Sequence, residues 1–398
     1  MGNIHNLSVI RQCFSYLSDH DVRFPIADYR VHKLTTMQCA KLIIASQLAH
    51  WGSFDQISRA LRMSNTLQKD LNLPSISASQ ISRKLRTIPT ENLEPVFLNL
   101  IAKVKQTLAS TSSSKKLRII DSTSINLPAG LAKWAYVNPK QTHIKLHMRV
   151  LVVPDIQAIP ESMIPTTGNV TDYETVNQLI EDKETIYVMD RGYVKYAFFD
   201  QWLENEIRFV VRINEKHAVL RVEQEREVPT NTVIVRDAIV QLGSAYTQTE
   251  RTLRLVEFLD QEGRCYRVVT SCYDLSALEV AEIYKQRWMI ELFFKWIKQH
   301  LRIVKVYSHE PQGVWNQIYL ALIAYAIALL IQQASGTRLT HWQVLQTVRC
   351  SWDKPFSLMQ KELRRKALRS SRGRQKSDRP PKSVHIPTVG VMKHLKLT

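Results

Sequence analysis

The most restrictive feature of this sequence is an uninterrupted apolar run, "IYLALIAYAIALLI", at residues 318–331. A helix with this composition has no polar face to present to water, so it must be enclosed on all sides. The run is shorter than the roughly 20 residues that span a bilayer, and Gln317 and Gln332 bracket it closely. We therefore expect a buried helix at the centre of a core. A membrane span is the alternative, and it would require the flanking residues to tilt into the bilayer.

The chain carries a large excess of positive charge. Its 398 residues include 54 Lys and Arg against 36 Asp and Glu, which gives a formal net charge of +18. This surplus favours a polyanionic partner, with nucleic acid first among the candidates, over a basic protein that has no such partner. The length suggests about two or three domains.

The cysteines and the amino terminus indicate an intracellular protein. The five cysteines form no C-x-x-C pair and have no histidine pair at zinc-ligand spacing nearby, so we expect reduced and mostly buried thiols. The amino terminus lacks a charged start followed by an apolar run, so no signal peptide is predicted. We expect a cytoplasmic location, no membrane association and, since the chain has no P-loop, no nucleotide cofactor.

The first 110 residues show helical periodicity and few strand signals. Within them, "LNLPSISASQISRKLRTIP" combines a turn, a candidate cap at Ser79 and a basic amphipathic helix, as a helix-turn-helix does. A plain helical hairpin has the same pattern. We expect residues 1–110 to form a helical domain that can contact DNA.

The rest of the chain alternates between strand and helix patterns. Residues 111–207 carry short apolar strands such as "KLRIIDSTSI" and "HIKLHMRVLVV", with a helix near 172–182, which predicts an α/β core. Residues 208–272 are rich in strands and are predicted to form an antiparallel insertion, and residues 273–350 return to helix. Residues 351–398 form a basic tail. From residue 354 onwards the tail has 13 Lys and Arg against two acidic residues, which suits contact with phosphates, although a solubilising tail is the alternative.

Two aspartates end apolar runs: Asp121 follows "LRII" and Asp190 follows "IYVM". A carboxylate beside a buried strand costs several kcal/mol, roughly, unless a positive or hydrogen-bonding group compensates it. Either residue alone is explained more simply as a turn or helix-cap aspartate. Together they form a candidate pair at two strand ends.

A third carboxylate lies in "YKQRWMIELFFKWIKQ", which the pattern predicts to be one helix over residues 284–299. At about 100° per residue, five polar side chains fall on one narrow stripe. They are Tyr284, Arg287, Glu291, Lys295 and Lys298. A solvated face with i,i+4 ion pairs is the simpler interpretation of such a stripe, but it leaves the two aspartates and the basic charge unexplained.

These residues together resemble a known family, the DDE transposases of bacterial insertion sequences. The specific similarity is to the branch with the signature Y-x2-R-x3-E-x6-K, which is complete here as Tyr284, Arg287, Glu291 and Lys298. The segment "DRGY" at 190–193 resembles the second family motif, and "IIDSTSI" with Asp121 resembles the first. The distance of 101 residues from Asp190 to Glu291 resembles the branch with a β-strand insertion before the glutamate helix.

The resemblance implies an RNase H-like catalytic core. It implies that Asp121, Asp190 and Glu291 are the catalytic residues and hold two Mg²⁺ ions, for which Mn²⁺ can substitute. Six further residues are expected to contact DNA near the cleaved end. They are Tyr284, Arg287, Lys298, Lys295, Arg191 and Tyr193.

The implied activity is cut-and-paste transposition of an insertion sequence on double-stranded DNA, by a homodimer or larger assembly on paired element ends. Two alternatives are open: a metal-dependent nuclease that cuts without joining, and a catalytically silent DNA-binding derivative. His143 and His147 are four residues apart on one predicted strand. Without a third ligand we expect them to be ordinary strand residues.

Overall fold

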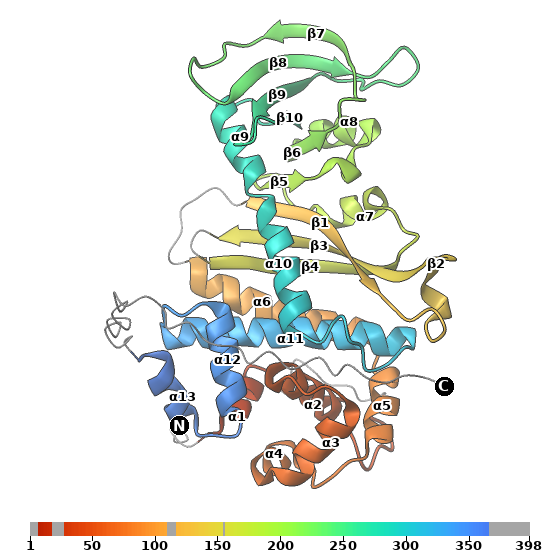
Figure 1. Ribbon diagram of the computed structural model, residues 1–398, viewed down its shortest axis with the longest axis vertical. Helices are drawn as coiled ribbons and strands as arrows, with labels where there is room; N and C mark the ends of the chain where they lie inside the picture. Colours follow the sequence, from red (N-terminus) through yellow and green to blue (C-terminus); the bar gives the residue numbers. More distant parts are fainter. Residues whose placement is uncertain (1–6, 18–27, 110–116, 154–155, 366–398) are drawn as a thin grey trace, which may run out of the picture.

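The computed structural model describes residues 7–17, 28–109, 117–153 and 156–365. A group of helices lies at one end of the protein and a long sheet at the other, and helix α11 (Pro311–Ser335) lies between them (Figure 1). The helices before the sheet are α1 (Val9–Ser15), α2 (Thr36–Ala49), α3 (Phe54–Met63), α4 (Asn65–Leu71), α5 (Ala78–Thr87) and α6 (Leu93–Ala109).

The predicted buried helix is confirmed as α11. Its most apolar window is long enough to cross a membrane by length and composition, yet 94% of that window is buried inside the protein. α2, α5, α6 and α12 (His341–Ser351) all pack against it. The N-terminal helices and one face of the sheet therefore share one hydrophobic core around α11.

Helix caps explain where several of the N-terminal helices begin. Thr35 and Gln38 form a reciprocal capping box at α2, and Ser77 and Gln80 form another at α5. The expected cap at Ser79 is wrong, because Ser79 is the second residue of α5 and the side chain that accepts from the first-turn N–H groups is that of Ser77.

All ten strands of the described residues belong to one sheet. They follow the order β2-β3-β1-β5-β6-β10-β9-β8-β7, with β4 also paired to β3. The β1–β5 and β5–β6 pairs are parallel and the others are antiparallel. The strands are β1 (Leu117–Asn126), β2 (Tyr136–Asn138), β3 (Gln141–Val153), β4 (Ile156–Thr167), β5 (Ile186–Met189), β6 (Arg208–Ile213), β7 (Val219–Glu225), β8 (Ile234–Leu242), β9 (Leu253–Leu259) and β10 (Cys265–Thr270).

Two of these strands differ from what the sequence pattern suggested. β4 has no counterpart in the prediction, because Pro160 and Pro165 interrupt its pattern. Proline is tolerated there because β4 pairs on one side only, with β3. β6, in the segment expected to be antiparallel, pairs parallel to β5 and extends the same sheet.

Helices cover both faces of the first half of the sheet. α7 (Asp172–Leu179) and α8 (Tyr196–Glu204) pack on one face with the side chains of Ile120, Tyr187 and Met189. α6, α10 (Trp288–His300) and α11 share a core with the other face, where Ile119 and Val188 point. Successive side chains on a strand alternate between faces, so this assignment also fixes where their neighbours point.

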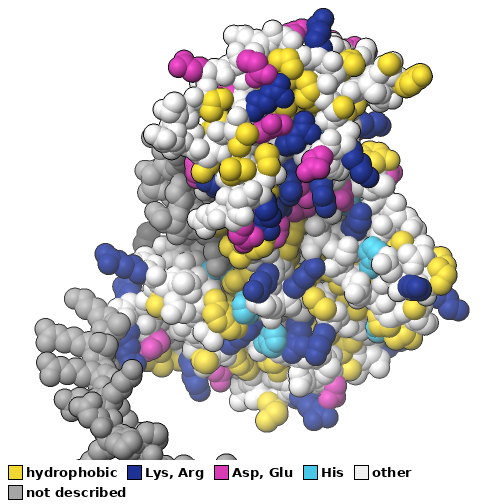
Figure 2. Space-filling view, turned by 45° about the horizontal axis from the view of Figure 1, so that its top comes forward, with side chains coloured by type: hydrophobic (Ala, Val, Ile, Leu, Met, Phe, Trp, Pro, Cys, Tyr) yellow, Lys and Arg dark blue, Asp and Glu magenta, His cyan; other side chains and the backbone are white. Residues whose placement is uncertain are grey.

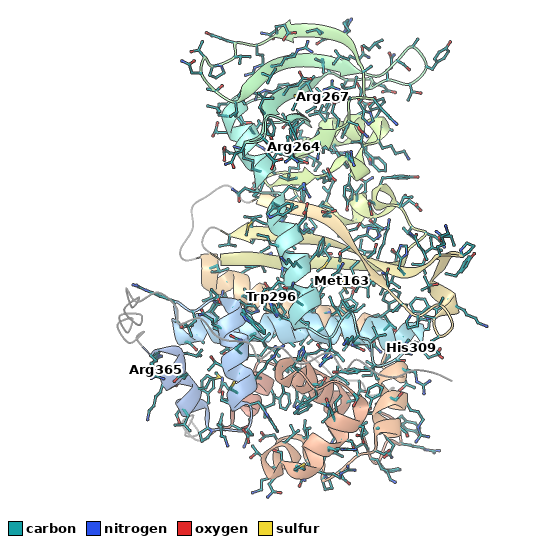
Figure 3. The ribbon with its side chains drawn as sticks, viewed as in Figure 1. Met163, Arg264, Arg267, Trp296, His309 and Arg365 are labelled. Carbon is teal, nitrogen blue, oxygen red and sulfur yellow. The ribbon has the colours of Figure 1, made fainter. Side chains whose placement is uncertain are left out.

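The predicted single helix over 284–299 is two helices. α9 (Ala277–Lys285) ends and α10 begins at Trp288, and short i→i+3 hydrogen bonds cross the junction, such as Met289 N–H to the Gln286 carbonyl at 2.9 Å. α10 descends across the sheet to α11, where Trp296 packs edge-on against Tyr325 at 5.0 Å between centroids (Figure 3).

The start of the predicted tail is also ordered. α13 (Phe356–Leu363) buries Phe356, Met359 and Leu363, so residues 356–363 pack as a helix rather than as part of a loose basic segment. The remainder of that basic stretch, beyond residue 365, lies outside the described residues. Of the five free cysteines, Cys13, Cys39 and Cys272 are buried, and Cys265 and Cys350 are exposed.

A buried ion pair joins the outer part of the sheet to α9. Arg254 on β9 donates to both carboxylate oxygens of Asp237 on β8, at 2.9 and 2.7 Å. Its remaining nitrogen donates to the carbonyls of Cys272 and Leu275, just before α9 begins. The arginine therefore holds in place the segment from which the α9–α10 pair departs.

We expect Arg254→Met to lower the free energy of unfolding by about 3–5 kcal/mol, because it leaves the buried Asp237 with only the longer ion pair to Arg226, at 3.6 Å. Urea denaturation followed by circular dichroism measures the change. Arg264→Ala is the matched control, since Arg264 is an exposed partner of Asp260 and an exposed ion pair contributes little to stability. Equal effects of the two changes would contradict this role of the buried pair.

Candidate active site

Parallel pairing of β1 with β5 places Asp121 beside Asp190. The paired positions run up to Ile120 opposite Met189; Asp121 is the next residue on β1, and Asp190 is the first residue after β5. Alternation puts both carboxylates on the face of Ile119 and Val188, which is the α10 side. The prediction that Asp121 ends its strand is wrong, because β1 continues to Asn126; what ends there is its pairing with β5.

Glu291 reaches the same place from the first turn of α10. Arg287 lies between the carboxylates: its Nη2 donates to Glu291 Oε1 at 2.5 Å, and its Nη1 lies 3.5 Å from Asp121 Oδ2. The Arg287 side chain is only 14% exposed, so this contact is partly shielded from water. One guanidinium therefore links carboxylates from β1 and α10.

Tyr284 completes the connection to the second aspartate. Its hydroxyl donates to Asp190 Oδ1 at 3.4 Å, and the Arg287 guanidinium lies 5.9 Å from the centre of its ring. Burial raises the pKa of Tyr284, and the nearby Asp190 raises it further. The phenol therefore stays protonated and can donate this hydrogen bond.

The electrostatics of Asp121 are unfavourable for a charged carboxylate. Burial raises the pKa of Asp121 from 3.8 to about 7, and the charges of Asp190 and Asp172 add to the rise. The Ser122 N–H and Arg287 oppose it without compensating fully. The surroundings of Asp121 thus disfavour its charged form, and carboxyl groups with a shifted pKa of this kind are typical of functional sites.

The remaining predicted DNA-contacting residues differ in their exposure. Lys295 on α10 and Arg191 in the turn after Asp190 are exposed, and Lys298 is half-buried, with its pKa lowered by burial. In Figure 2, Lys and Arg side chains mix with acidic ones across the middle of the face turned forward. Tyr193 is different: it is 1% exposed, so in this arrangement its hydroxyl is shielded from any DNA.

The donor chemistry of the site fits a divalent cation. Three carboxylates are the oxygen ligands that Mg²⁺ and Mn²⁺ prefer. Within the residues that the structure describes, however, no group of three acidic, His or Cys side chains is close enough to share one ion. Arg287 accounts for this, because its guanidinium lies between Asp121 and Glu291. The three carboxylates can hold a divalent cation only if the Arg287 guanidinium moves out from between Asp121 and Glu291.

One carboxylate near the site, that of Asp172, is not among the residues predicted from the sequence. Asp172, the first residue of α7, accepts a hydrogen bond from the Ser122 hydroxyl at 2.7 Å. The segment "TDYE" reads as an ordinary capped helix start, so only the sequence-distant partner distinguishes Asp172. His147 is buried beside it, whereas His143 packs against Gly168, and neither lies in a metal-binding group of the described residues.

Carboxylates from β1, from the end of β5 and from α10, set beside basic side chains, are of the kind that supports metal-assisted phosphoryl chemistry. The family model described as the Transposase DDE domain matches residues 112–327, more than half of the chain. The chain belongs to this family.

Curated relatives agree with the family. The chain is 30% identical over 260 residues to the "Probable transposase for insertion sequence element IS5377" of Geobacillus stearothermophilus, covering 64% of this chain and 67% of that protein. It is 31% identical over 216 residues to the "Putative transposase y4zB" of Sinorhizobium fredii, covering 53% and 59%. It is 28% identical over 203 residues to the "Putative transposase for insertion sequence element IS4SA" of Synechocystis, covering 48% and 56%. The chain thus spans little more than half of the second and third relatives.

The pKa of Asp121 leads to a pH-dependent prediction. Since the folded pKa of about 7 lies above the ordinary 3.8, the folded state holds a proton that the unfolded state releases between these values. Stability is therefore lost as pH rises from about 4 to 7. We expect Asp121→Asn to stabilise the protein by up to about 4 kcal/mol at pH 8, and by much less at pH 5.

Thermal melts at pH 5 and pH 8 with a metal chelator measure this difference. Asp55→Asn removes an exposed acid on α3 and should change stability little at either pH. If Asp121→Asn gave the same change at both pH values, the account of Asp121 would be wrong.

Proposed function

We propose that this protein is an insertion-sequence transposase that binds terminal inverted repeats and performs Mg²⁺-dependent DNA cleavage and strand transfer in the cytoplasm, as a homodimer or larger assembly on paired ends. The observation that carries the proposal is the meeting of Asp121, Asp190 and Glu291 around Arg287 and Tyr284. The family and the names of the relatives support the same activity.

We further propose that the catalytic core is RNase H-like. The strands β4-β3-β1-β5-β6 support this, because three antiparallel strands continue into two parallel ones and helices lie on both faces. Strands β7 to β10 are antiparallel to their neighbours and lie between β6 and α9 (Figure 1), which supports an insertion there. The domain limits that we propose are 1–110, 111–207, 208–272, 273–350 and 351–398, with β6 at the start of the third range completing the core sheet.

In the proposed mechanism the three carboxylates would hold two Mg²⁺ ions. When bound, these ions supply an activated water or 3′ hydroxyl and stabilise the leaving oxygen. The protein's own residues position the DNA. Arg287 is suited to bidentate contact with a phosphate, and Lys295, Lys298 and Arg191 are suited to point contacts around it. Tyr193, being buried, is better suited to supporting the carboxylates than to touching DNA.

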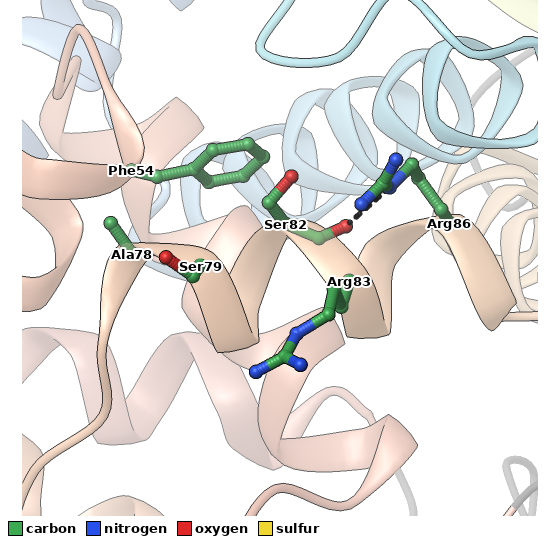
Figure 4. A pocket seen from close by; sticks show the side chains of 6 residues that line it. All are labelled: Phe54, Ala78, Ser79, Ser82, Arg83 and Arg86. Carbon is green, nitrogen blue, oxygen red and sulfur yellow. Dashed lines mark hydrogen bonds between the residues drawn. The ribbon is translucent and has the colours of Figure 1, made fainter.

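α5 is the element that we propose for recognition of the element ends. It packs on α2, α3 and α11, and its outer side lines an open hollow of about 630 Å³ with Phe54 of α3 (Figure 4). Arg83 and Arg86 point along this hollow, where the Arg86 Nε–H donates to the Ser82 carbonyl. A short basic helix with exposed serines and arginines fits the major groove of DNA.

We expect Arg83→Ala combined with Arg86→Ala to weaken binding of end DNA by about 10- to 100-fold and to flatten the salt dependence, since each lost phosphate contact lowers the slope by roughly one. Fluorescence anisotropy with a labelled duplex of the element end measures both. Arg264→Ala, on the distant β9–β10 turn (Figure 3), is the control. Unchanged affinity would remove α5 from the DNA interface.

We expect Asp121→Asn, Asp190→Asn and Glu291→Gln each to reduce cleavage of end DNA by at least about 1,000-fold with little change in DNA affinity, because all three are needed to hold the ions. Cleavage and joining are followed on gels with uncut and pre-cut ends and Mg²⁺. Cleavage without joining by the unaltered protein would favour the nuclease alternative. Retained activity in all three variants would exclude this site.

A further inference from the structure

Asp172 lies behind the proposed metal site, at the first position of α7. A reciprocal capping box between Thr171 and Glu174 sets the start of this helix, with the Thr171 N–H donating to Glu174 Oε1 at 2.9 Å. Val176 of α7 packs into the core on the α7 face of the sheet, with Ile120 and Met189. Asp172 is therefore held firmly next to the strands that carry the two catalytic aspartates.

Two contacts of Asp172 reach the neighbours of those aspartates. Asp172 Oδ1 accepts the Ser122 hydroxyl at 2.7 Å, and Ser122 directly follows Asp121. Asp172 Oδ2 faces Gly192, two residues after Asp190, so closely that an added Cβ there would lie 3.2 Å from it. One side chain thus binds the first segment and lies beside the second.

A buried polar group is also aimed at Asp172. The side chain of His147 is 0% exposed, and its Nδ1, which makes no hydrogen bond, lies 3.5 Å from Asp172 Oδ1. Its Nε2 pairs with the Thr166 hydroxyl at 3.0 Å. Lys145 Nζ donates to the same Asp172 oxygen at 3.4 Å and to the Val170 carbonyl at 3.1 Å.

The register explains why these groups converge. His147 stands opposite Ser122, and Lys145 opposite Ser124, in the β1–β3 pair. Alternation therefore places Ser122, His147 and Lys145 on the α7 face, while Asp121 points to the α10 face. The cluster lies on the face opposite Asp121, and its hydrogen-bonded link to Asp121 runs through the backbone of β1.

We propose that Asp172 is a positioning residue for the transposase reaction: by binding Ser122 and packing against Gly192, it fixes the separation of Asp121 and Asp190. This inference rests on the proposed function, since it concerns the same carboxylates. The hydrogen bond is the link that we propose, and the asparagine variant separates it from the charge of Asp172, which also acts on Asp121. An asparagine can keep the hydrogen bond, with its amide oxygen accepting from Ser122 and its nitrogen in the place of Oδ2.

The test compares Asp172→Ala, Asp172→Asn and Ser122→Ala in the full chain. Cleavage of end DNA gives kcat and KM, a Mn²⁺ titration gives the half-saturating concentration, and thermal melts report folding. We expect Asp172→Ala and Ser122→Ala each to lower kcat or raise the Mn²⁺ requirement by about 10- to 100-fold with KM for DNA unchanged. Asp172→Asn should stay within about threefold of the unaltered protein.

The double variant Asp172→Ala, Ser122→Ala should be no worse than either single one, because both remove the same link. Glu174→Gln is the matched control: it removes a charge from the same turn, keeps a residue that can cap, and should leave all readouts unchanged. Additive losses, or no loss in Asp172→Ala, would overturn the proposal. If Asp121→Asn also left cleavage intact, the proposed function itself would fail.

Discussion

The parallel pairing of β1 with β5 is the constraint on which the rest of the site depends. Because the two strands run in the same direction and in register up to Ile120 and Met189, the residues that follow face each other on one side of the sheet. Both happen to be aspartates. Glu291 reaches the same point because it lies on α10. The start of the α9–α10 pair is fixed at the outer part of the sheet by the ion pair between Arg254 and Asp237.

Burying acids in this way creates an electrostatic problem that Arg287 solves in part. It lies against Asp121 and Glu291, and Tyr284 donates to Asp190, so each carboxylate has a partner. The same guanidinium would oppose a cation at the site. We infer that a DNA phosphate competes for Arg287, so that binding of DNA favours binding of metal.

Much of this arrangement could be predicted because it depends on local patterns. The buried helix follows from an unbroken apolar run, and Asp121, Asp190 and Glu291 stood out by position and by resemblance to a family. The α9–α10 junction could not be seen, because neither Gln286 nor Arg287 is a helix breaker and packing at the site sets the break. The cap at Ser77 was available as a Ser-x-x-Gln pattern and was assigned two residues too late.

Other features depend on partners that are distant in sequence. The parallel direction of β6, the burial of Tyr193 and the contacts of Asp172 all arise from pairing and packing across tens of residues. The hydrophobic pattern within one segment does not show which distant segment it will pair or pack with. β4 was missed for a different reason, because prolines that an edge strand tolerates hide its pattern.

The central claim is that Asp121, Asp190 and Glu291 converge on one cation site, and iron-directed backbone cleavage tests it without relying on transposition. Fe²⁺ bound in place of Mg²⁺, with ascorbate and peroxide, cuts the chain next to its ligands, and mass spectrometry locates the cuts. With end DNA present to draw Arg287 away, the account predicts cuts near residues 121, 190 and 291 that excess Mg²⁺ suppresses and that Asp121→Asn removes together. Cuts near only one of the three, or cuts that persist in that variant, would contradict it.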